Sequence, residues 1–177
     1  MKNNETINKI INGVLFQCVW FATIFQVWML AVPFFLMLLG HFVYESKLFG
    51  NSLSRRKDAL ILIVVPGLGI TIDTMYGING VYNFPNAGMQ PVSSGAPLWL
   101  WANWIAFSLT LTRSLSWLSK RRHLFVLLCS IVGPISYFSG KSLGVIDFRN
   151  ELIMLVVLEW FVVGAIISAI LSIKSKA

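Results

Sequence analysis

Charged residues are missing from two long stretches of this chain, and this pattern constrains the fold more than any other feature. Residues 10–44 contain no Lys, Arg, Asp or Glu, and residues 59–112 contain only Asp73. A helix needs about 20 mainly apolar residues to cross a hydrocarbon core of roughly 30 Å. The sequence therefore predicts an all-α fold, a bundle of transmembrane helices, with residues 1–177 forming a single integral-membrane domain.

The composition agrees with that class. Hydrophobic residues make up 56% of the chain and charged residues 12%, whereas a soluble domain carries about 25% charged residues. The net charge of +7 comes from basic residues at the ends of the apolar stretches. The positive-inside rule accounts for this placement, so nucleic acid is not expected as a partner.

Six spans are expected, at residues 10–27, 29–45, 58–77, 98–118, 123–140 and 150–173. The uncharged run 10–44 would be about 52 Å long as one helix, too long for a single crossing. Pro33 also disfavours an unbroken helix, so a tight hairpin near Trp28 is expected. The alternative is one long first span and five crossings.

The basic residues predict the orientation of these spans. With six crossings, the chain termini and two of the loops lie in the cytoplasm and hold a strong excess of Lys and Arg, while the outer segments hold few. The cytoplasmic residues in question are Lys2, Lys9, Lys47, Arg55, Arg56, Lys57, Lys120, Arg121, Arg122, Lys174 and Lys176. Both termini are therefore expected in the cytoplasm.

Four polar side chains are expected at one depth in the outer half of the bundle. Counting helix rise from the nearest span end places Asp73, Tyr137 and Asn103 about 21–22 Å above the cytoplasmic boundary, with Glu159 about 10 Å below the outer boundary. A charge at mid-membrane costs roughly 2.5–3.5 kcal/mol, so each such residue needs a reason. The hypothesis is a shared polar pocket, and the alternative is a hydrogen-bonded cluster that fixes helix packing.

Small residues flank two of these side chains. Gly69 and Gly77 lie one turn either side of Asp73, and Gly133 and Gly140 flank Tyr137 in the same way. They allow another helix or a ligand to come close.

A second group of candidates has weaker signals. His41 and Glu45 are spaced i, i+4, which suits a hydrogen-bonded pair or a proton relay. Arg113, near the inner end of the fourth span, can reach lipid phosphates, and Lys141 is placed to neutralise Asp73 or Glu159. Most tryptophans are expected to be interface anchors, with stacking on a ligand as the alternative, chiefly for the cluster of Trp99, Trp101 and Trp104.

Other features carry less information. Cys18 and Cys129 stand alone in apolar runs, so neither a metal site nor a cofactor is expected. The uncharged segment 78–97 contains Asn79-Gly80 and three prolines, which predict an irregular loop. It is either a plain connector or a lid over a cavity.

The order and spacing of several segments resemble a family of small bacterial inner-membrane proteins of unknown function. The segments are Gly69-Ile-Thr-Ile-Asp73 with Gly77 and Phe84, Pro97-Leu-Trp99 running to Trp104-Ile-Ala-Phe107, Ser114-Leu-Ser-Trp117-Leu118, Gly133-Pro134-Ile-Ser-Tyr137 with Gly140 and Gly144, and Glu159-Trp160. The resemblance implies a location in the bacterial inner membrane. Relatives encoded near genes for membrane-lipid modification point toward lipid chemistry, but the resemblance implies no activity.

Three functions follow as hypotheses. The first is a binding or accessory protein that acts on membrane lipids or on a lipid-modifying membrane partner. The second is a small proton-coupled transporter that uses Asp73. The third is an intramembrane enzyme with Asp73 and Glu159 as acid and base, since two carboxyl groups close together in apolar surroundings do not both ionise easily.

Overall fold

The computed structural model describes residues 2–25, 31–48, 52–85 and 90–172, with the side chains of 2–4, 44–48, 52–55 and 119 left aside. This part of the chain is built from helices joined by loops, which confirms the predicted all-α class. Its α-helices are α1 (Lys2–Ile24), α2 (Ala31–Leu48), α3 (Ser52–Ile78), α4 (Leu98–Leu111), α5 (Arg122–Ser142) and α6 (Ile153–Leu171). Two short 3-10 helices, η2 (Ser116–Lys120) and η3 (Asn150–Leu152), precede α5 and α6.

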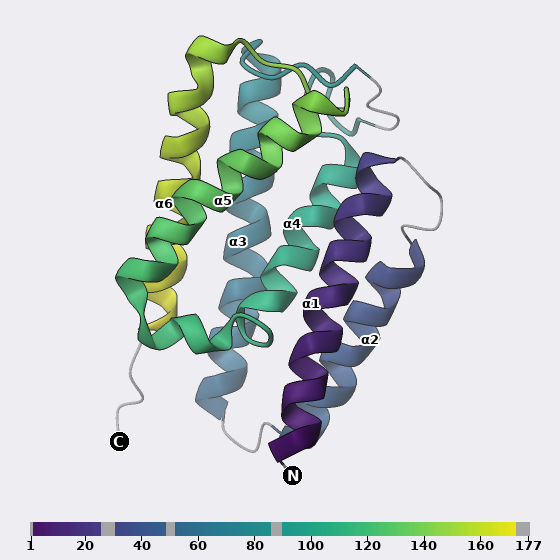
Figure 1. Cartoon of the computed structure of the whole chain (residues 1–177), viewed down its shortest axis with the longest axis vertical. Coiled ribbons are helices and arrows are strands. Elements are labelled where there is room, and N and C mark those ends of the chain that lie inside the picture. The colour runs from purple at the N-terminus through teal and green to yellow at the C-terminus, as the bar shows by residue number, and fades with distance from the viewer. Residues whose placement is uncertain (1, 26–30, 49–51, 86–89, 173–177) are drawn as a thin grey trace.

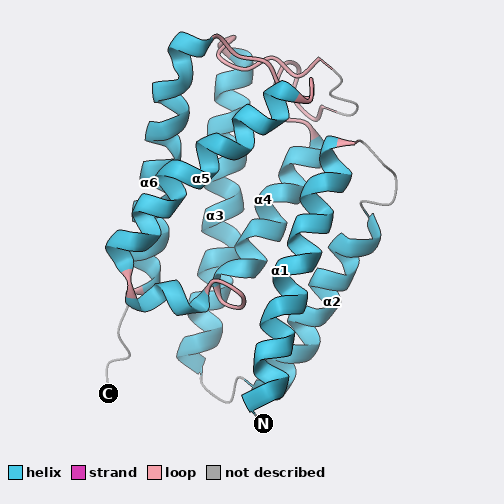
Figure 2. Ribbon diagram, viewed as in Figure 1, coloured by secondary structure: helices cyan, strands magenta, loops and turns pink. Residues whose placement is uncertain are grey.

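The helices run up and down the bundle in chain order (Figure 1). α1 and α2 lie side by side at one edge, α5 and α6 pack together at the other, and α3 and α4 lie between them. The irregular segments are confined to the two ends of the bundle (Figure 2). α1 therefore begins, and α6 ends, at the same end.

The long uncharged run forms two helices rather than one. α1 ends at Ile24 and α2 begins at Ala31, and the two pack against each other and against α4. Val19 of α1 and Met37 of α2 are buried in a common apolar cluster with Ala106 and Leu109 of α4. The expected hairpin turn near Trp28 falls outside the described residues.

The fourth helix is shorter than the expected span 98–118, because α4 ends at Leu111. In its last turns the hydroxyls of Ser108 and Thr110 donate to carbonyls three residues back, a local pairing that weakens helix propagation. Beyond the end, Thr112 and Arg113 bind residues of α3 and α2. These contacts hold the chain in a turn before η2 begins.

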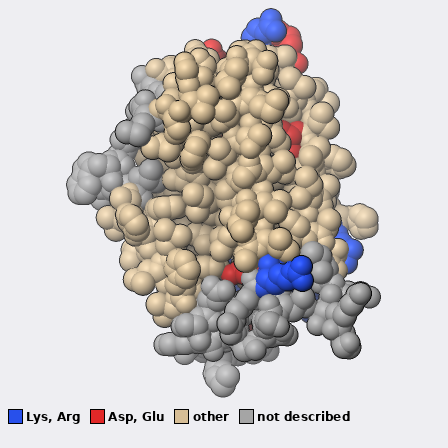
Figure 3. Space-filling view, turned by 180° about the vertical axis from the view of Figure 1, so that it is seen from behind, with Lys and Arg blue, Asp and Glu red and all other residues tan. Residues whose placement is uncertain are grey.

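The outer surface of the bundle is apolar over a wide band. Side chains such as Phe25, Phe35, Phe42, Ile63 and Met154 are each more than 60% exposed. Most of the visible charged side chains lie toward the two ends (Figure 3). A monomeric soluble protein does not expose so much contiguous apolar surface.

Four helical segments are long and apolar enough to cross a membrane: Glu5–Ile24, Arg56–Ile78, Arg122–Ser142 and Asn150–Leu171. The apolar parts of α2 (Ala31–Val43) and of α4 (Leu98–Leu111) are shorter. The 14 residues of α4 rise about 21 Å, less than a hydrocarbon core of roughly 30 Å.

The loop after α3 packs into the end of the bundle. Its Tyr82 and Phe84 are 2% and 6% exposed. Asn83 exchanges both backbone hydrogen bonds with Asp147 of the loop between α5 and α6, at 2.8 and 2.7 Å. The two loops are thereby tied together over the end of the bundle opposite the start of α1.

Candidate functional site

Asp73 is the centre of a buried hydrogen-bond cluster between α3, α4 and α5. Its side chain is fully buried. Trp104 Nε1 donates to Oδ2 at 2.6 Å, and the Tyr137 hydroxyl lies 2.8 and 2.9 Å from Oδ1 and Oδ2. A buried carboxyl group is tolerated when such donors satisfy it. The structure thus brings together Asp73 and Tyr137, two of the four expected pocket residues, and adds Trp104.

Glu159 forms a second, neighbouring cluster on α6. It is 3% exposed, and the Tyr82 hydroxyl donates to Oε2 at 3.0 Å. The rings of Tyr82 and Tyr137 lie 5.5 Å apart between their centroids, so two tyrosines in contact stand between the two carboxyl groups. Burial, and after it the neighbouring Glu159 carboxylate, raise the pKa of Tyr82 above its ordinary value.

Two glycines make room for the indoles of this region. A Cβ atom on Gly69 would lie 2.2 Å from Trp104 Cδ2, and one on Gly133 would lie 2.0 Å from Trp160 Cδ2. The two indoles stack with their centroids 5.0 Å apart. The glycines predicted to allow close approach therefore admit aromatic side chains of α4 and α6 against α3 and α5.

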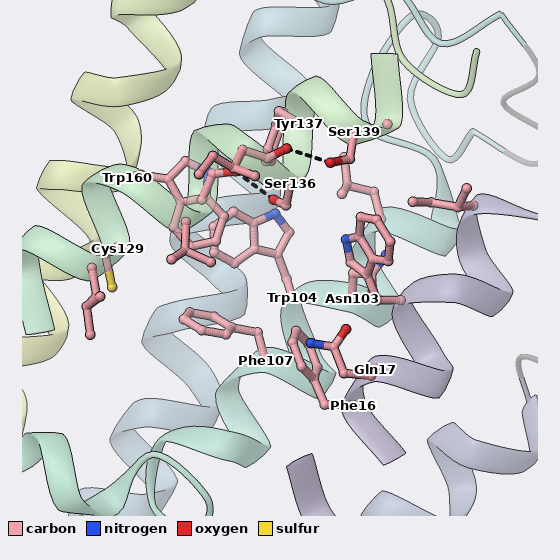
Figure 4. Close-up of a pocket in the computed structure, with 18 of the residues that line it drawn as sticks. Phe16, Gln17, Asn103, Trp104, Phe107, Cys129, Ser136, Tyr137, Ser139 and Trp160 are labelled. Carbon is pink, nitrogen blue, oxygen red and sulfur yellow. Dashed lines mark hydrogen bonds between the residues drawn. The ribbon is translucent and has the colours of Figure 1, made fainter. Parts of the chain in front are cut away.

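An apolar cavity of about 420 Å³ lies beside this cluster, between α1, α4 and α5. Its aromatic lining residues include Phe16, Trp104, Phe107 and Trp160 (Figure 4). Trp104 and Tyr137 line the cavity and also bind Asp73. They form the wall between it and the carboxyl group, and neither Asp73 nor Glu159 is among the lining residues.

The mouth of the cavity lies on the flank of the bundle. Gln17 of α1 is exposed, and Val132 and Ile135 of α5 are 57% and 56% exposed, and all three line the cavity. The opening therefore lies between α1 and α5, within the apolar band, where acyl chains would be the solvent.

Asn103 belongs to the cavity rather than to the Asp73 cluster. Its Nδ2 donates to Thr23 Oγ1 of α1 at 2.7 Å, and that hydroxyl donates in turn to the Trp20 carbonyl at 2.6 Å. Asn103 lies on the same helix as Trp104, but its side chain points toward α1. The depth predicted from helix rise therefore does not bring it to Asp73. Trp99, one turn earlier on α4, also lines the cavity.

A second polar cluster, near the opposite end of the bundle, joins α2, α3 and the end of α4. His41 Nε2 lies 2.9 Å from Asp58 Oδ2, and Thr112 Oγ1 donates to Asp58 Oδ1 at 2.5 Å. Arg113 Nη2 donates to the His41 carbonyl at 3.1 Å. His41, Asp58 and Arg113 are all less than 10% exposed, so Arg113 is buried and does not extend to lipid phosphates.

Two expectations about paired charges have different outcomes. The side chain of Glu45, the predicted partner of His41, lies outside the described part of the structure. Lys141 does not neutralise Asp73 or Glu159. Its Nζ contacts the Phe148 carbonyl, Asn150 Oδ1 at 3.0 Å and Asp147 at 3.4 Å, because the α5–α6 loop folds back over it.

Sequence reasoning missed Asp58 and Tyr82. Asp58 directly follows three basic residues, and this position predicts only the start of the third span. Tyr82 lies in a loop expected to be irregular, where aromatic residues among Gly, Asn and Pro were the available signal. As for metals, the described residues contain no group of three or more His, Cys, Asp or Glu side chains placed to hold an ion.

Four membrane-length apolar helices, an apolar exterior and a cavity on the flank of the bundle together define a helical membrane protein. Residues 9–167 match the family model described as "Protein of unknown function (DUF2878)", and the chain belongs to this family. The order and spacing of the sequence segments predicted membership in an uncharacterised family, and this match confirms it. No curated protein and no solved structure gives a match to the chain.

Proposed function

We propose that this protein is a six-span protein of the bacterial inner membrane that binds a membrane lipid and serves a lipid-associated accessory role. The cavity between α1, α4 and α5 carries this proposal. Its volume of about 420 Å³ falls in the range of ligand sites, roughly 300–1,000 Å³. Its lining is almost entirely apolar, and its mouth lies in the apolar band.

The position of the cavity favours a ligand that arrives from the bilayer. α1 and α5 flank the mouth, and α4 forms the floor between them (Figure 4). An acyl chain can enter sideways without passing a charged lining residue. The carboxyl groups of Asp73 and Glu159 lie behind the cavity wall, so the cavity geometry supports binding more directly than it supports acid–base catalysis.

A photoactivatable fatty-acyl lipid tests this proposal. The purified protein in nanodiscs is expected to crosslink at cavity residues of α1, α4 and α5. Ser136→Phe fills the cavity, since Ser136 lines it, and should remove most of the labelling. Ser142→Phe is the matched control: it lies on the same helix, is exposed, and loses an equivalent hydroxyl bond to its own helix.

Equal labelling of Ser136→Phe and wild type would overturn the proposed lipid site. Labelling confined to the outer faces of the helices, outside the cavity, would do the same. Retained labelling in Ser142→Phe shows that the loss in Ser136→Phe comes from the filled cavity.

The six-span topology is supported by the alternating directions of α1 to α6 and by the basic residues expected on the cytoplasmic side. The shorter α4 is followed by a turn and by η2, which ends at Lys120. A reporter active only in the periplasm, fused to the N-terminus, should be inactive. Activity there would contradict a cytoplasmic N-terminus and favour five crossings.

Proton-coupled transport is a second candidate, supported by the carboxyl groups buried within the bundle. The hydrogen bonds described for Asp73 and Glu159 come from uncharged groups, namely Trp104, Tyr137 and Tyr82. Buried carboxyl groups with uncharged partners can take up and release a proton during a transport cycle. Asp73→Asn should then abolish proton-driven flux in liposomes, and unchanged flux would exclude Asp73 from the mechanism.

A further inference from the structure

Glu159 has fewer hydrogen-bond donors than the other buried carboxyl group of the outer half, Asp73. It accepts one hydrogen bond, from the Tyr82 hydroxyl to Oε2 at 3.0 Å. Its second oxygen, Oε1, is buried and has no hydrogen-bond partner among the described residues. An ionised Glu159 would therefore hold a charged oxygen unpaired in apolar surroundings. That arrangement costs far more than an unpaired oxygen of the neutral acid.

Asp73 has the opposite environment. Trp104 Nε1 donates to Oδ2 at 2.6 Å, and the Tyr137 hydroxyl lies 2.8 and 2.9 Å from Oδ1 and Oδ2. Both oxygens of Asp73 thus have a donor. Hydrogen bonds to a charged acceptor are stronger than those to a neutral one. Of the two groups, Asp73 is therefore the one whose surroundings support a negative charge.

Neither carboxyl group has a cationic partner in the part of the chain that the structure describes. The ion pairs found there involve other carboxylates, namely Glu5, Asp58 and Asp147. The remaining titratable side chains beside the pair are tyrosines, which offer uncharged hydroxyls. The ring of Tyr82 contacts Tyr76 of α3 and Tyr137 of α5, with centroids 5.2 and 5.5 Å apart. Two carboxyl groups that share such surroundings do not both ionise easily.

We propose that Asp73 and Glu159 form a proton-binding site that holds one proton at neutral pH, on Glu159, while Asp73 is the carboxylate. Glu159 lies six residues into α6, about 9 Å from its start. Tyr82 reaches it from the loop at that end of the bundle. The site names Glu159 as the proton carrier of the transport candidate, but the assignment rests on these contacts and not on transport or lipid binding.

Infrared spectroscopy of isotope-labelled wild type tests the assignment without any substitution. The C=O stretch of a protonated carboxyl group is separated from the bands of carboxylates and backbone amides. The protein is purified at neutral pH in a detergent that contains no C=O group, with carbon-13 in the side-chain carboxyl of either glutamate or aspartate. We expect one protonated carboxyl band, shifted to lower frequency by labelled glutamate and unchanged by labelled aspartate.

Two results of this experiment would overturn the proposal. A band that shifts with labelled aspartate would place the proton on an aspartate. The absence of a protonated carboxyl band would show that the site holds no proton. Because wild type is measured, neither result depends on whether a variant folds.

Point variants assign the band to one glutamate. Glu159→Gln should remove it. Glu151→Gln is the matched control, since Glu151 is exposed at the start of the same helical segment, and it should leave the band unchanged. A band that persists in Glu159→Gln would contradict the proposal.

A pair of tyrosine variants tests the hydrogen bond to Glu159. Tyr82→Phe removes the donor to Oε2 and should shift the band to higher frequency, because a C=O group without a hydrogen bond is stiffer. Tyr137→Phe is the matched control: it removes a buried hydroxyl from Asp73 instead, so the frequency should stay the same. A shift in Tyr137→Phe, or none in Tyr82→Phe, would place the proton elsewhere.

The flux assay in liposomes separates this site from the transport candidate. A band assigned to Glu159 in a protein without proton-driven flux would reject transport and support the proton site. Flux in wild type without any protonated carboxyl band would support transport and overturn the proton site. Labelling of Ser136→Phe by the photoactivatable lipid tests the lipid site alone.

Discussion

Gly69→Ala tests the close packing of α3 on α4 that positions Asp73. The new methyl carbon would lie 2.2 Å from Trp104 Cδ2, far inside van der Waals contact. The indole is held on its other side by Trp160, with ring centroids 5.0 Å apart, and by its bond to Asp73. It cannot move away without breaking one of these contacts.

Gly67→Ala provides the reference for the magnitude. Gly67 lies on the same helix, and a Cβ atom there would have no heavy atom within 4 Å, so both variants gain the same intrinsic helix propensity. The difference between their free energies of unfolding is then the packing cost alone. It is about 1–3 kcal/mol if the indole shifts and keeps its bond to Asp73. Losing that bond as well would bring the difference to about 3–5 kcal/mol.

The measurement is the free energy of unfolding in mixed detergent micelles, followed by tryptophan fluorescence for wild type and both variants. Gly69→Ala should be less stable than Gly67→Ala by at least about 1 kcal/mol. Equal stability of the two alanine variants would refute the close approach of Trp104 to α3, and with it the placement of the Asp73 cluster.

Other predictions concern single polar contacts. Tyr137→Phe should lower the free energy of unfolding by about 1.5–3 kcal/mol, because Asp73 loses a buried donor; no change would show that this hydroxyl does not satisfy the carboxyl group. Asp58→Ala should lower the free energy of unfolding by about 3–5 kcal/mol, because it leaves the buried His41 side chain without its partner. Asp147→Ala should lower it by less than about 1 kcal/mol, because the Asp147 side chain is 62% exposed. Burial raises the pKa of Tyr82 in the folded protein. The contribution of the neutral Tyr82 hydroxyl to the free energy of unfolding is therefore fully present below the unfolded tyrosine pKa of about 10, and it is lost as the pH rises above that value. Denaturation measured from pH 8 to 11 should therefore show a shallower decline in Tyr82→Phe, and identical slopes would contradict this.

The helices were predictable because the signal for each is local. Charge-free runs of the right length, with basic residues between them, predict apolar helices wherever they occur. Helix boundaries were less predictable. α4 ends at Leu111 rather than at 118 because Thr112 and Arg113 bind residues of α3 and α2, which are distant in sequence.

For the polar side chains, the sequence predicts a depth but not a partner. Helix rise places Asp73, Tyr137, Asn103 and Glu159 at similar levels, yet depth says nothing about the angle at which a side chain leaves its helix. The structure pairs Asp73 with Tyr137 and turns Asn103 toward α1. Their role as a functional site stays a prediction.

By itself, the sequence determined that this chain forms apolar helices of membrane length, since the cost of placing charge in hydrocarbon is paid residue by residue. Only the tertiary structure decided that Tyr82 reaches Glu159 from a loop, that His41 meets Asp58, and that α1 and α5 stand apart over α4 to leave a cavity. Those outcomes depend on the rotation and tilt of each helix, which packing between many distant side chains fixes jointly.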